Sequence, residues 1–407
     1  MRDDMTEAQN TKRPGALIAM SGGVDSSVAA WLMQQAGYDC TGITMRLTRN
    51  ETLGQSGFHT CCSEKDIEDA AEVAFAMDIP YEVLDFTADF REKIIEKFIR
   101  VYEMGGTPNP CIDCNRCLKF GALLDRALVL GYDYIATGHY ARVDRDPDTG
   151  LYRLLRGRDR RKDQSYVLYS MTQDELRHTL FPLDGMTKTH TRELARKLGF
   201  YNADKPDSQD ICFVPDGDYA GFIEAWCRAC RCEGEILCTP LGLAGNGGPG
   251  SAPTETGAKK TSVATAFEPG EIVNRGGRVL GEHAGLIRYT IGQRKGIGVA
   301  AREPLYVLGK DASANRLVVG FKDELLSSGV VACDVNLISG GVLEGPRKVQ
   351  VKTHYRQRPV LATAEQTGPD ELTVTFEEPQ RAAAPGQAAV LYEGDVVLGG
   401  GTIARTF

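Results

Sequence analysis

Residues 17 to 28, Leu-Ile-Ala-Met-Ser-Gly-Gly-Val-Asp-Ser-Ser-Val, constrain the fold more than any other stretch of the chain. An apolar strand runs into a turn rich in serine and glycine, and an amphipathic segment follows directly. Gly22 and Gly23 let the backbone approach a ligand closely, and the helix N-terminus favours negative charge. Ser21, Ser26 and Ser27 add hydroxyl donors, while Asp25 suits Mg²⁺ better than phosphate. A capped helix after a glycine turn is the simpler alternative, but the complete string favours an anion site.

The kind of anion is narrowed by what the turn lacks. No lysine lies in the turn, so it is not a Walker A loop, and the later segment 257–261 (GAKKT) does not have that spacing either. The turn resembles the pyrophosphate loop of the ATP-pyrophosphatase superfamily. Members of that superfamily cleave ATP between the α and β phosphates and adenylate a substrate. The resemblance therefore implies bound ATP with Mg²⁺.

The first 200 or so residues alternate apolar, β-rich runs with helical patterns. Strands are predicted at 16–20, 40–47, 81–86 and 134–137, and helices at 26–35, 63–77, 90–104 and 120–130. This alternation predicts a parallel sheet with helices on both faces. Ligands of such sheets bind beyond the carboxyl ends of the strands. The glycine turn, Met45, Asp85 and Gly138-His139 all fall at those ends, so they are expected to share one crevice.

The pattern changes after about residue 208. Residues 239–265 are rich in Gly, Pro, Ala, Ser and Thr without periodicity, which predicts a disordered insertion. Short alternating runs follow at 330–337, 347–355, 372–376, 388–392 and 396–399. Their spacing predicts a small antiparallel β-barrel.

Composition excludes some classes of protein and leaves others open. The 407 residues are 42% hydrophobic and 25% charged, which is ordinary for a globular protein of two or three domains. No apolar run is long enough to span a membrane, and the first ten residues lack the pattern of a signal or transit peptide, so a cytoplasmic location is expected. The net charge of −8 argues mildly against a nucleic-acid partner.

Basic residues nevertheless gather in three places. One cluster contains Arg153, Arg156, Arg158, Arg160, Arg161 and Lys162; a second contains Arg347, Lys348, Lys352, His354, Arg356 and Arg358; the third is Gln293-Arg294-Lys295. A charged run is usually a solvated face. The clusters alone therefore do not decide between a solvated face and a binding surface.

Cysteines carry the second chemical signal. Residues 107–117 read TPNPCIDCNRC, in which two prolines predict an extended loop and the cysteines recur every three residues. About a hundred residues later, Cys212 lies in the segment DSQDICF. One interpretation is sulfur chemistry, in which one thiolate carries a persulfide and another resolves it. The other is a metal site, with Cys111, Cys114 and Cys212 as three thiolate ligands for zinc or an iron–sulfur cluster.

Two further groups of cysteines are less informative. Cys227, Cys230, Cys232 and Cys238 have a spacing that allows zinc, but no histidine lies nearby and the predicted disordered segment adjoins them. We expect these four to be incidental. Cys61-Cys62 precede a predicted helix cap at Ser63, which by itself assigns no role.

In combination, these motifs identify a family. From about residue 15 to the C-terminus, apart from residues 227–266, the chain resembles the tRNA-specific 2-thiouridylases of the MnmA type (TrmU in eukaryotes). The resemblance rests on the following segments: AMSGGVDSSVAA, CCSEKDIEDA, TPNPCIDCNRCLKFGALL, YIATGHYA, KDQSYVLY, LFPLDGMTKTHTRELA, DSQDICF, GEHAGLIRYTIGQRKGIG and PGQAAVLYEGDVVLGGGTI.

The resemblance implies three domains. The first, at 14–208, is an α/β catalytic domain like the adenine nucleotide alpha hydrolases. A small central domain follows at 209–328 and contains the insertion, and an antiparallel β-barrel that binds tRNA spans 329–407. A monomer is expected.

The resemblance also implies a reaction on the wobble uridine (position 34) of the tRNAs for Lys, Glu and Gln. ATP adenylates the C2 oxygen, pyrophosphate leaves, sulfur replaces the activated oxygen, and AMP departs. The sulfur comes from a cysteine desulfurase, directly or through a relay protein. Adenylation is needed because the carbonyl oxygen of uracil is a poor leaving group, and the loop and Mg²⁺ stabilise the charge that develops on phosphate.

Site residues follow from the matching motifs. Cys114 corresponds to the family's nucleophile and Cys212 to its persulfide carrier, and the two are implied to form a disulfide after transfer. The residues implied to hold ATP are Ala19, Met20, Ser21, Gly22, Gly23, Val24, Asp25, Ser26, Met45 and Gly138. The residues implied to contact tRNA are Asn109, Pro110 and Cys111 beside the target base, together with Lys162, Asp163, Gln164, Tyr355 and Arg356.

One position departs from the family pattern. Many members have Asp where this chain has Cys111, and that Asp is assigned acid–base work. The Cys111 thiol could take over proton transfer, Asp113 could substitute as the acid, or Cys111 could join Cys114 and Cys212 as ligands of a [4Fe-4S] cluster. We favour the persulfide route over a cluster.

Two other functions compete with thiolation. A different ATP-pyrophosphatase ligase, of the GMP or argininosuccinate synthetase type, would share the loop but would not need the paired cysteine motifs. A non-catalytic zinc or iron–sulfur RNA-binding protein would retain only a relic nucleotide site. Intact Ser21, Asp25 and Ser26 argue against a relic.

Overall fold

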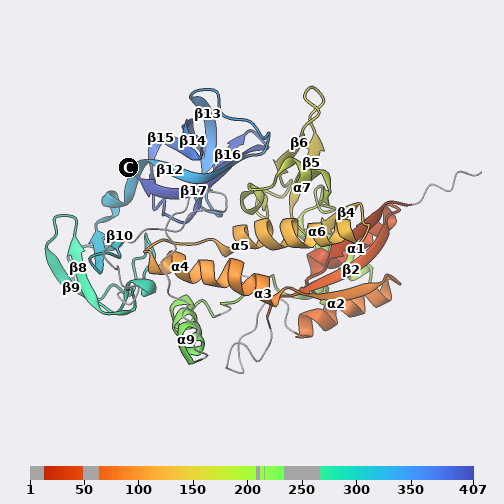
Figure 1. Ribbon diagram of the computed structural model, residues 1–407, viewed down its shortest axis with the longest axis horizontal. Coiled ribbons are helices and arrows are strands. Elements are labelled where there is room, and N and C mark those ends of the chain that lie inside the picture. The colour runs from red at the N-terminus through yellow and green to blue at the C-terminus, as the bar shows by residue number, and fades with distance from the viewer. Residues whose placement is uncertain (1–12, 49–63, 208–210, 215, 233–265) are drawn as a thin grey trace, which may run out of the picture.

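The computed structural model describes residues 13–48, 64–207, 211–214, 216–232 and 266–407. Figure 1 shows an N-terminal α/β domain at the right, a small sheet at the left and a barrel above, with the helices α4 (Lys97–Glu103), α5 (Pro110–Asp113) and α6 (Leu123–Val129) running between them. The insertion predicted at 239–265 lies outside the described residues, as do Cys61, Cys62 and Cys238. In the part of the chain that is described, no helix is long and apolar enough to cross a membrane.

The N-terminal domain is built on the predicted parallel sheet. Its order is β3 (Tyr81–Asp85), β2 (Asp39–Arg46), β1 (Gly15–Ala19), β4 (Tyr134–Thr137) and β7 (Thr179–Leu180), and all neighbouring pairs are parallel. The four predicted strands are confirmed to within one residue at each end. The short edge strand β7 was not predicted.

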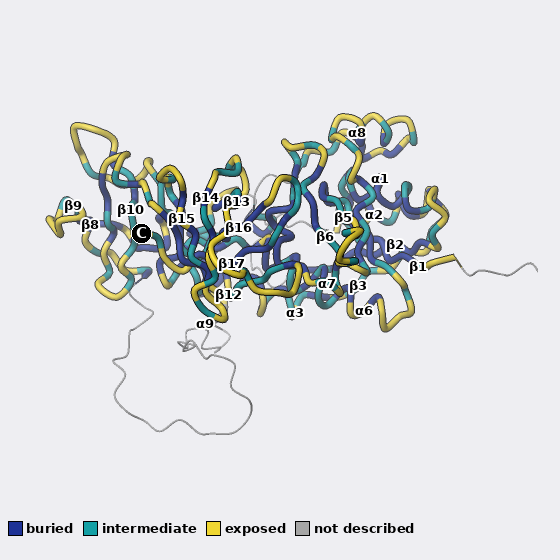
Figure 2. The backbone as a smooth tube through the Cα atoms, turned by 90° about the horizontal axis from the view of Figure 1, so that it is seen from above, coloured by how far each residue is buried: buried dark blue, intermediate teal, exposed yellow. Residues whose placement is uncertain are grey.

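Helices cover both faces of this sheet. In β1, Ala16 and Ile18 face one core and Leu17 faces the other, as the two-residue repeat of a strand requires. The first core is closed by α1 (Val24–Gln35), α2 (Glu64–Ala76) and α8 (Lys188–Lys197). Figure 2 shows the buried residues concentrated in the strands, with exposed residues on the outer side of α8.

Two long helical runs close the other face. The first consists of α3 (Thr87–Phe90), a π-helical segment (Arg91–Glu96) and α4 (Lys97–Glu103). The second consists of α5 (Pro110–Asp113), a π-helical segment (Cys114–Ala122) and α6 (Leu123–Val129). The extended loop predicted for 107–117 is therefore wrong from residue 110 onward. Pro110 is the first residue of a helix, where its missing N–H costs no hydrogen bond and its fixed φ is already helical.

Further elements complete the N-terminal region. They are the strands β5 (Ala141–Arg145) and β6 (Tyr152–Arg156), the helices α7 (Gln173–Arg177) and α9 (Tyr219–Cys232), and 3₁₀ turns at Ser165–Leu168 and Tyr201–Asp204.

The middle of the chain forms a separate four-stranded sheet. Its order is β10 (Tyr306–Asp311), β11 (Arg316–Gly320), β8 (Gly270–Asn274) and β9 (Val279–His283), with 3₁₀ turns at Leu286–Arg288 and Lys322–Leu325. Ile272, Val307 and Leu317 are fully buried in its own small core. The sequence patterns did not predict these strands.

The C-terminal region is the predicted antiparallel barrel. Its six strands run in the order β12 (Leu326–Leu337), β15 (Glu371–Arg381), β14 (Val360–Gly368), β13 (Arg347–Lys352), β16 (Ala388–Glu393) and β17 (Val396–Thr406). Pairing of β12 with β17 closes the barrel. The β5–β6 hairpin of the N-terminal region extends the same sheet, because Leu154 and Leu155 pair with Val397 and Val396. The barrel is thus tied to the α/β domain by backbone hydrogen bonds.

Candidate functional site

The glycine turn is a tightly braced loop between β1 and α1. Gly22 has φ +69°, and a Cβ there would lie 2.3 Å from the carbonyl oxygen of Asp66. Ser26 Oγ accepts from the Ser21 N–H (3.2 Å) and donates to the Gly23 carbonyl (3.0 Å), to which Ser27 Oγ also donates (3.1 Å). These bonds hold the turn in the open shape that an anion site needs.

The turn is also held from behind by residues that the sequence did not single out. Asn202 Nδ2 donates to the Gly22 carbonyl (3.2 Å) and to Ser27 Oγ (2.9 Å). Lys205 Nζ donates to the same Gly22 carbonyl (3.1 Å) and pairs with Asp66 (2.6 Å) and Asp69. Residues after β7 therefore hold the glycine turn in place and restrict the movement of Gly22.

Asp25 lies at the first turn of α1 and is already engaged. Tyr140 Oη donates to Asp25 Oδ1 (2.7 Å), and Lys188 Nζ pairs with Asp25 Oδ2 (2.7 Å). Thr191 Oγ1 lies 3.0 Å from the same phenol oxygen, and burial followed by the Asp25 charge raises the pKa of the phenol. In the described part of the chain, no group of three or more His, Cys, Asp or Glu side chains could hold a metal ion. One carboxylate beside an anion site nevertheless fits Mg²⁺, which binds through few protein ligands and substrate phosphates.

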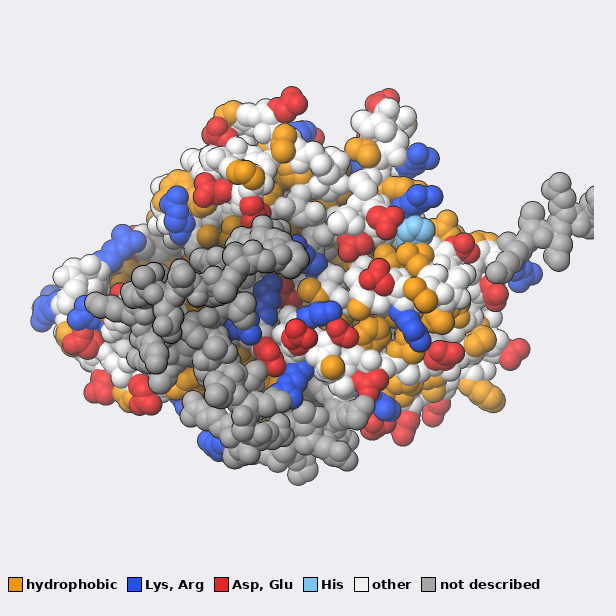
Figure 3. Space-filling view, in the orientation of Figure 1, with side chains coloured by type: hydrophobic (Ala, Val, Ile, Leu, Met, Phe, Trp, Pro, Cys, Tyr) orange, Lys and Arg blue, Asp and Glu red, His pale blue; other side chains and the backbone are white. Residues whose placement is uncertain are grey.

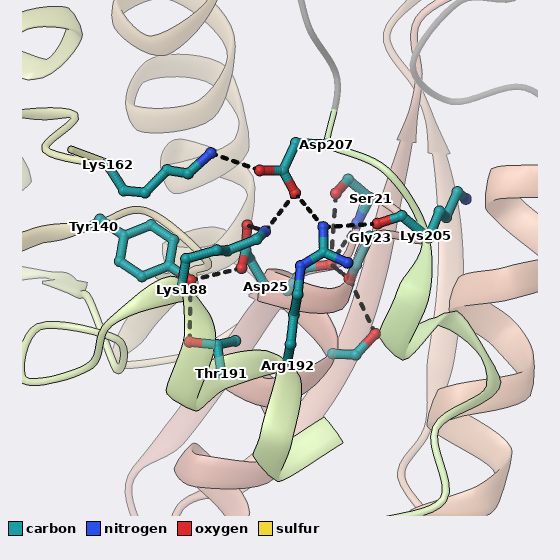
Figure 4. A network of polar contacts seen from close by, with 12 residues as sticks. Ser21, Gly23, Asp25, Tyr140, Lys162, Lys188, Thr191, Arg192, Lys205 and Asp207 are labelled. Carbon is teal, nitrogen blue, oxygen red and sulfur yellow. Dashed lines mark hydrogen bonds and ion pairs between the residues drawn. The ribbon is translucent and has the colours of Figure 1, made fainter. Parts of the chain in front are cut away.

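Three cations converge on Asp207 beside the turn (Figure 4). Lys162 and Lys188 each lie 2.7 Å from an Asp207 oxygen, and Arg192 lies 2.9 Å away. Burial alone would raise the pKa of Asp207, but the hydrogen bonds from Lys162 and Lys188 outweigh it and lower the pKa to about 2. Positive charge is thus concentrated at the mouth of the glycine turn. Lys188 and Arg192, four residues apart on α8, are functional candidates that the motif analysis quoted but did not assign.

The predicted ATP-contacting residues all lie at the carboxyl edge of the parallel sheet. Ala19 ends β1, Met45 is the penultimate residue of β2, and Gly138 follows β4. A Cβ on Gly138 would lie 2.8 Å from both the Asp25 carbonyl carbon and the Ser26 nitrogen. Only glycine lets β4 pass this close to the start of α1. His139, next along, is buried against Thr137 (2.7 Å), and burial lowers its pKa well below the usual value.

The candidate sulfur-transfer cysteines border one hydrophobic core. Cys114 begins the π-helical segment after α5, and both Cys114 and Cys212 are half-buried and pack against the core of the α/β domain. Cys212 is held there by its neighbour Phe213, whose ring lies 5.1 Å from that of Phe98 and 5.7 Å from that of Phe90. The fold therefore brings two segments about a hundred residues apart to the same core.

Cys111 and Asp113 differ in their exposure to solvent. Cys111 is exposed, whereas Asp113 is buried with Lys97 Nζ 2.6 Å away. Burial raises the pKa of Asp113 despite the opposing Lys97 charge. Asp113 is thus engaged with α4. The proposed iron–sulfur ligands Cys111, Cys114 and Cys212 do not form a three-ligand group among the described residues, so this arrangement does not fit a cluster. Of the later cysteines, Cys227 is buried in the same core.

The loop that leads into α5 is clamped by the other two regions. Gln387 Nε2, from the barrel, donates to the carbonyls of Thr107 (3.0 Å) and Pro108 (3.2 Å), and the Thr107 N–H donates to the Pro385 carbonyl (2.7 Å). From the middle sheet, Lys310 Nζ donates to the Gly106 carbonyl (3.1 Å). After α5, Arg116 forms a two-pronged ion pair with Asp334 of β12. The helix that carries Cys111 and Cys114 is therefore positioned by the barrel on both sides.

The predicted tRNA-contacting segments surround this helix. Asp163 is buried and accepts from the N–H groups of Gly157 (3.0 Å) and Ser165 (3.1 Å), and Gln164 Oε1 accepts from the Tyr140 N–H (2.9 Å). The Lys162–Gln164 segment is thus bonded to Tyr140, whose hydroxyl donates to Asp25. Tyr355 follows β13, and burial, then Asp163 and Cys111, raise its pKa to about 12. Tyr355 and Cys111 are therefore close enough to interact electrostatically.

Many residues of the basic clusters are paired. Arg153 bonds to Asp144 (2.7 Å) and Asp146 (2.9 Å), Arg160 pairs with Asp395, and Arg347 pairs with Glu393 (2.7 Å). Figure 3 shows Lys and Arg side chains interleaved with Asp and Glu across the middle of this face, near helix α4 of Figure 1. Arg356 and Arg358 form no ion pair with any residue that the structure describes. Together with the largely buried Lys352, they are the Lys and Arg residues of the second cluster without an ion pair to a described residue.

Comparison with known protein families places matches along most of the chain. Residues 15–216 match the family described as the tRNA methyl transferase HUP domain, residues 262–321 match the tRNA methyl transferase PRC-barrel domain, and residues 327–403 match the aminomethyltransferase beta-barrel domain. The middle sheet is thus a PRC-barrel domain.

Curated relatives match nearly the whole chain. A tRNA-specific 2-thiouridylase MnmA from Carboxydothermus hydrogenoformans is 45% identical over 395 residues, which cover 97% of this chain and 98% of that protein. One of the same name from Moorella thermoacetica is 44% identical over 387 residues, covering 95% and 98%. Among solved structures, an NMN synthetase from Francisella tularensis has a TM-score of 0.32 at 16% identity and covers 57% of this chain and 92% of its own. That likeness is too low to bear on function.

Proposed function

Because the chain belongs to the MnmA family of tRNA-specific 2-thiouridylases, and is thus a tRNA sulfurtransferase, we propose that it thiolates C2 of the wobble uridine in the tRNAs for Lys, Glu and Gln. The observation that carries the proposal is the convergence of Lys162, Lys188 and Arg192 at the glycine turn, on the same domain whose core carries Cys114 and Cys212. Thiolation accounts for both the cations at the glycine turn and the two cysteines. Neither a ligase of the synthetase type nor a non-catalytic metal protein has to be invoked.

In the first step, ATP binds along Ala19–Ser26, with Met45 and Gly138 beside it. The turn, α1 and the three cations would stabilise the charge on the β and γ phosphates, and Mg²⁺ held through Asp25 would supply further electrostatic stabilisation. The uridine C2 oxygen attacks the α phosphate and pyrophosphate leaves. Lys188 links Asp25 to Asp207, because its Nζ lies 2.7 Å from a carboxylate oxygen of each.

In the second step, the terminal sulfur of a Cys212 persulfide attacks C2, and AMP leaves with the activated oxygen. Cys114 then attacks Cys212 Sγ, the sulfur–sulfur bond breaks, and its electron pair stays on the uridine sulfur. The products are 2-thiouridine, AMP, pyrophosphate and a disulfide between Cys114 and Cys212. A thiol reductant and a new sulfur atom from a cysteine desulfurase or relay protein restore the enzyme for the next turnover.

The role of Cys111 in this scheme is limited. It is exposed at the first turn of α5, beside Tyr355, which suits contact with the target base together with Asn109 and Pro110. We also propose that the enzyme acts as a monomer in the cytoplasm, where thiols are kept reduced.

The test uses anaerobically purified protein with ATP, Mg²⁺, unmodified tRNA, a thiol reductant, and a cysteine desulfurase with cysteine as the source of sulfane sulfur, followed by nucleoside mass spectrometry. Iron and acid-labile sulfide are measured on the same sample, and the variants are Cys111→Ala, Cys114→Ala and Cys212→Ala. Thiolation by iron-free protein that is lost in the Cys114 and Cys212 variants supports the persulfide route. Thiolation that tracks iron content and needs all three cysteines would overturn that route, and absence of 2-thiouridine would overturn the proposed function.

A further inference from the structure

A buried lysine lies at the end of β13, among the segments predicted to contact tRNA. Lys352 is only 5% exposed, and its Nζ lies 5.4 Å from the ring centre of Tyr166 and 5.6 Å from that of Tyr355. It donates no hydrogen bond to, and forms no ion pair with, any residue that the structure describes. Its Nζ is not one of the fully buried polar atoms that lack a partner, so the ammonium keeps some contact with solvent and its three donors are available. Lys352 is therefore prepared for an acceptor that arrives from outside.

Lys352, Tyr166 and Tyr355 contact one another and form a cluster, the Lys352 cluster. Tyr166 is fully buried and its hydroxyl donates to the Ala388 carbonyl (3.0 Å), so its ring is a fixed wall. Tyr355 is 36% exposed, with its ring centre 6.2 Å from that of Tyr166, so it forms the open side. Tyr355 interacts with both Cys111 and Asp163, and Asp163 also acts on Lys352. The Lys352 cluster therefore interacts electrostatically with residues of the other two predicted contact segments.

The chemistry of the Lys352 cluster suits a flat ring with a carbonyl oxygen. Aromatic faces stack nucleobases, and a lysine can donate hydrogen bonds but cannot accept them. A backbone phosphate is a poorer ligand for Lys352, since Arg356 and Arg358 are exposed on the adjoining loop whereas Lys352 is only 5% exposed. Uracil presents the acceptor O4 where cytosine presents an amino donor. The C2 oxygen must face ATP, which leaves O4 for the lysine.

We propose that Lys352 and Tyr355 form the subsite for the pyrimidine that is modified, with Lys352 donating to O4 and so selecting uracil over cytosine. This inference rests on the proposed function and adds to it the residue that recognises the base. Lys352 acts as a specificity-determining residue, and Tyr355 as the stacking face that closes over the base.

The experiment removes the two partners separately and together. Wild-type protein and Lys352→Met are assayed with tRNA carrying uridine, cytidine or 4-deoxyuridine at position 34, and AMP and the 2-thio nucleoside are measured. We expect loss of O4 to lower wild-type kcat/KM about 10- to 100-fold, as for a hydrogen bond to a charged group. Lys352→Met should show a similar fall with uridine and little further fall with 4-deoxyuridine. Lys352→Gln, whose amide can also accept, should narrow the preference for uridine over cytidine.

Controls separate this contact from a structural role. Lys322→Met makes the same change at an exposed lysine outside the Lys352 cluster and should behave as wild type. Urea midpoints and ATP affinities check the fold, and the 4-deoxyuridine arm on wild-type protein remains decisive if a Lys352 variant does not fold. Equal wild-type rates with uridine and 4-deoxyuridine would overturn the proposal. So would an equal loss for all three bases with a salt slope reduced by about 1, which would indicate a phosphate contact. Failure of wild type to thiolate uridine would instead count against the proposed function.

Discussion

Gln387 of the barrel donates one amide group to two consecutive carbonyls of the N-terminal domain, those of Thr107 at 3.0 Å and Pro108 at 3.2 Å. These carbonyls lie two and three residues before the first turn of α5, which carries Cys111. The Thr107 N–H, bonded to Pro385 at 2.7 Å, completes the connection. The barrel therefore does more than offer a surface, since it fixes where α5, the helix that carries Cys111, begins.

Replacing Gln387 with Glu tests this relationship with almost no change of shape. The carboxylate has no donor and would repel both carbonyls, so α5 should shift. We expect kcat for thiolation to fall about 10- to 100-fold, because small misplacements of reacting groups are costly. ATP affinity, measured by calorimetry, should stay within about twofold because the glycine turn is elsewhere. Gln35→Glu, at the exposed end of α1, is the control and should leave both quantities unchanged.

Much of the α/β domain could be predicted because its elements follow local patterns. The strands β1 to β4 are short β-rich runs, of which β1, β2 and β4 are largely buried, and the structure places each within one residue of its prediction. The glycine turn was recognised for the same reason, because the strand, turn and helix are adjacent in sequence. The start of α5 was missed because two prolines close together are typical of a loop. Pro110 lies in the first turn of the helix, the one turn in which proline is tolerated.

The features that were not predicted depend on residues far apart in the sequence or on weak hydrophobic patterns. The strand β14 points Ala362 and Ala364 into the barrel, and alanine gives little hydrophobic contrast with its polar neighbours. The pairing of Leu155 with Val396 joins segments about 240 residues apart in the chain, and no local pattern encodes it. The cations at the glycine turn were missed for the same reason, since Lys162 and the two α8 residues that contact Asp207 come from separate parts of the fold.

Gly22 allows a steric prediction with a matched control. A Cβ at Gly22 would lie 2.3 Å from the Asp66 carbonyl, whereas at Gly37, which also has positive φ, it would meet nothing within 4 Å. Gly22→Ala should therefore lose ATP binding and about 2 kcal/mol or more of stability, and Gly37→Ala only about 1 kcal/mol with ATP binding intact. Urea unfolding and ATP titration measure both. Equal effects of the two substitutions would show that backbone strain alone, and not the Asp66 contact, makes Gly22 necessary.

Lys188 should be the most sensitive cation of the site, because it contacts Asp25 and Asp207 at once. Lys188→Met removes a charge from the position where the pyrophosphate leaves, so we expect kcat/KM for ATP to fall about 100-fold or more. Release of pyrophosphate in the presence of tRNA is the measurement. Lys197→Met, on the last turn of the same helix, changes an exposed lysine and should have no effect. A fall confined to tRNA affinity would assign Lys188 to RNA binding instead.

Asp207 predicts how stability depends on pH. Its pKa is lowered from 3.8 in the unfolded chain to about 2 in the folded protein, because the hydrogen bonds from Lys162 and Lys188 outweigh the effect of burial. The folded state therefore binds fewer protons than the unfolded state between these values, and stability falls as pH falls from about 4 to about 2. The carboxylate is partly exposed, so solvent screening limits its contribution to about 1 kcal/mol. Asp207→Asn should lower the urea midpoint at pH 6 and show a smaller decline between pH 5 and pH 3 than wild type does. An identical decline in both proteins would mean that other carboxylates, and not Asp207, govern acid sensitivity in this range.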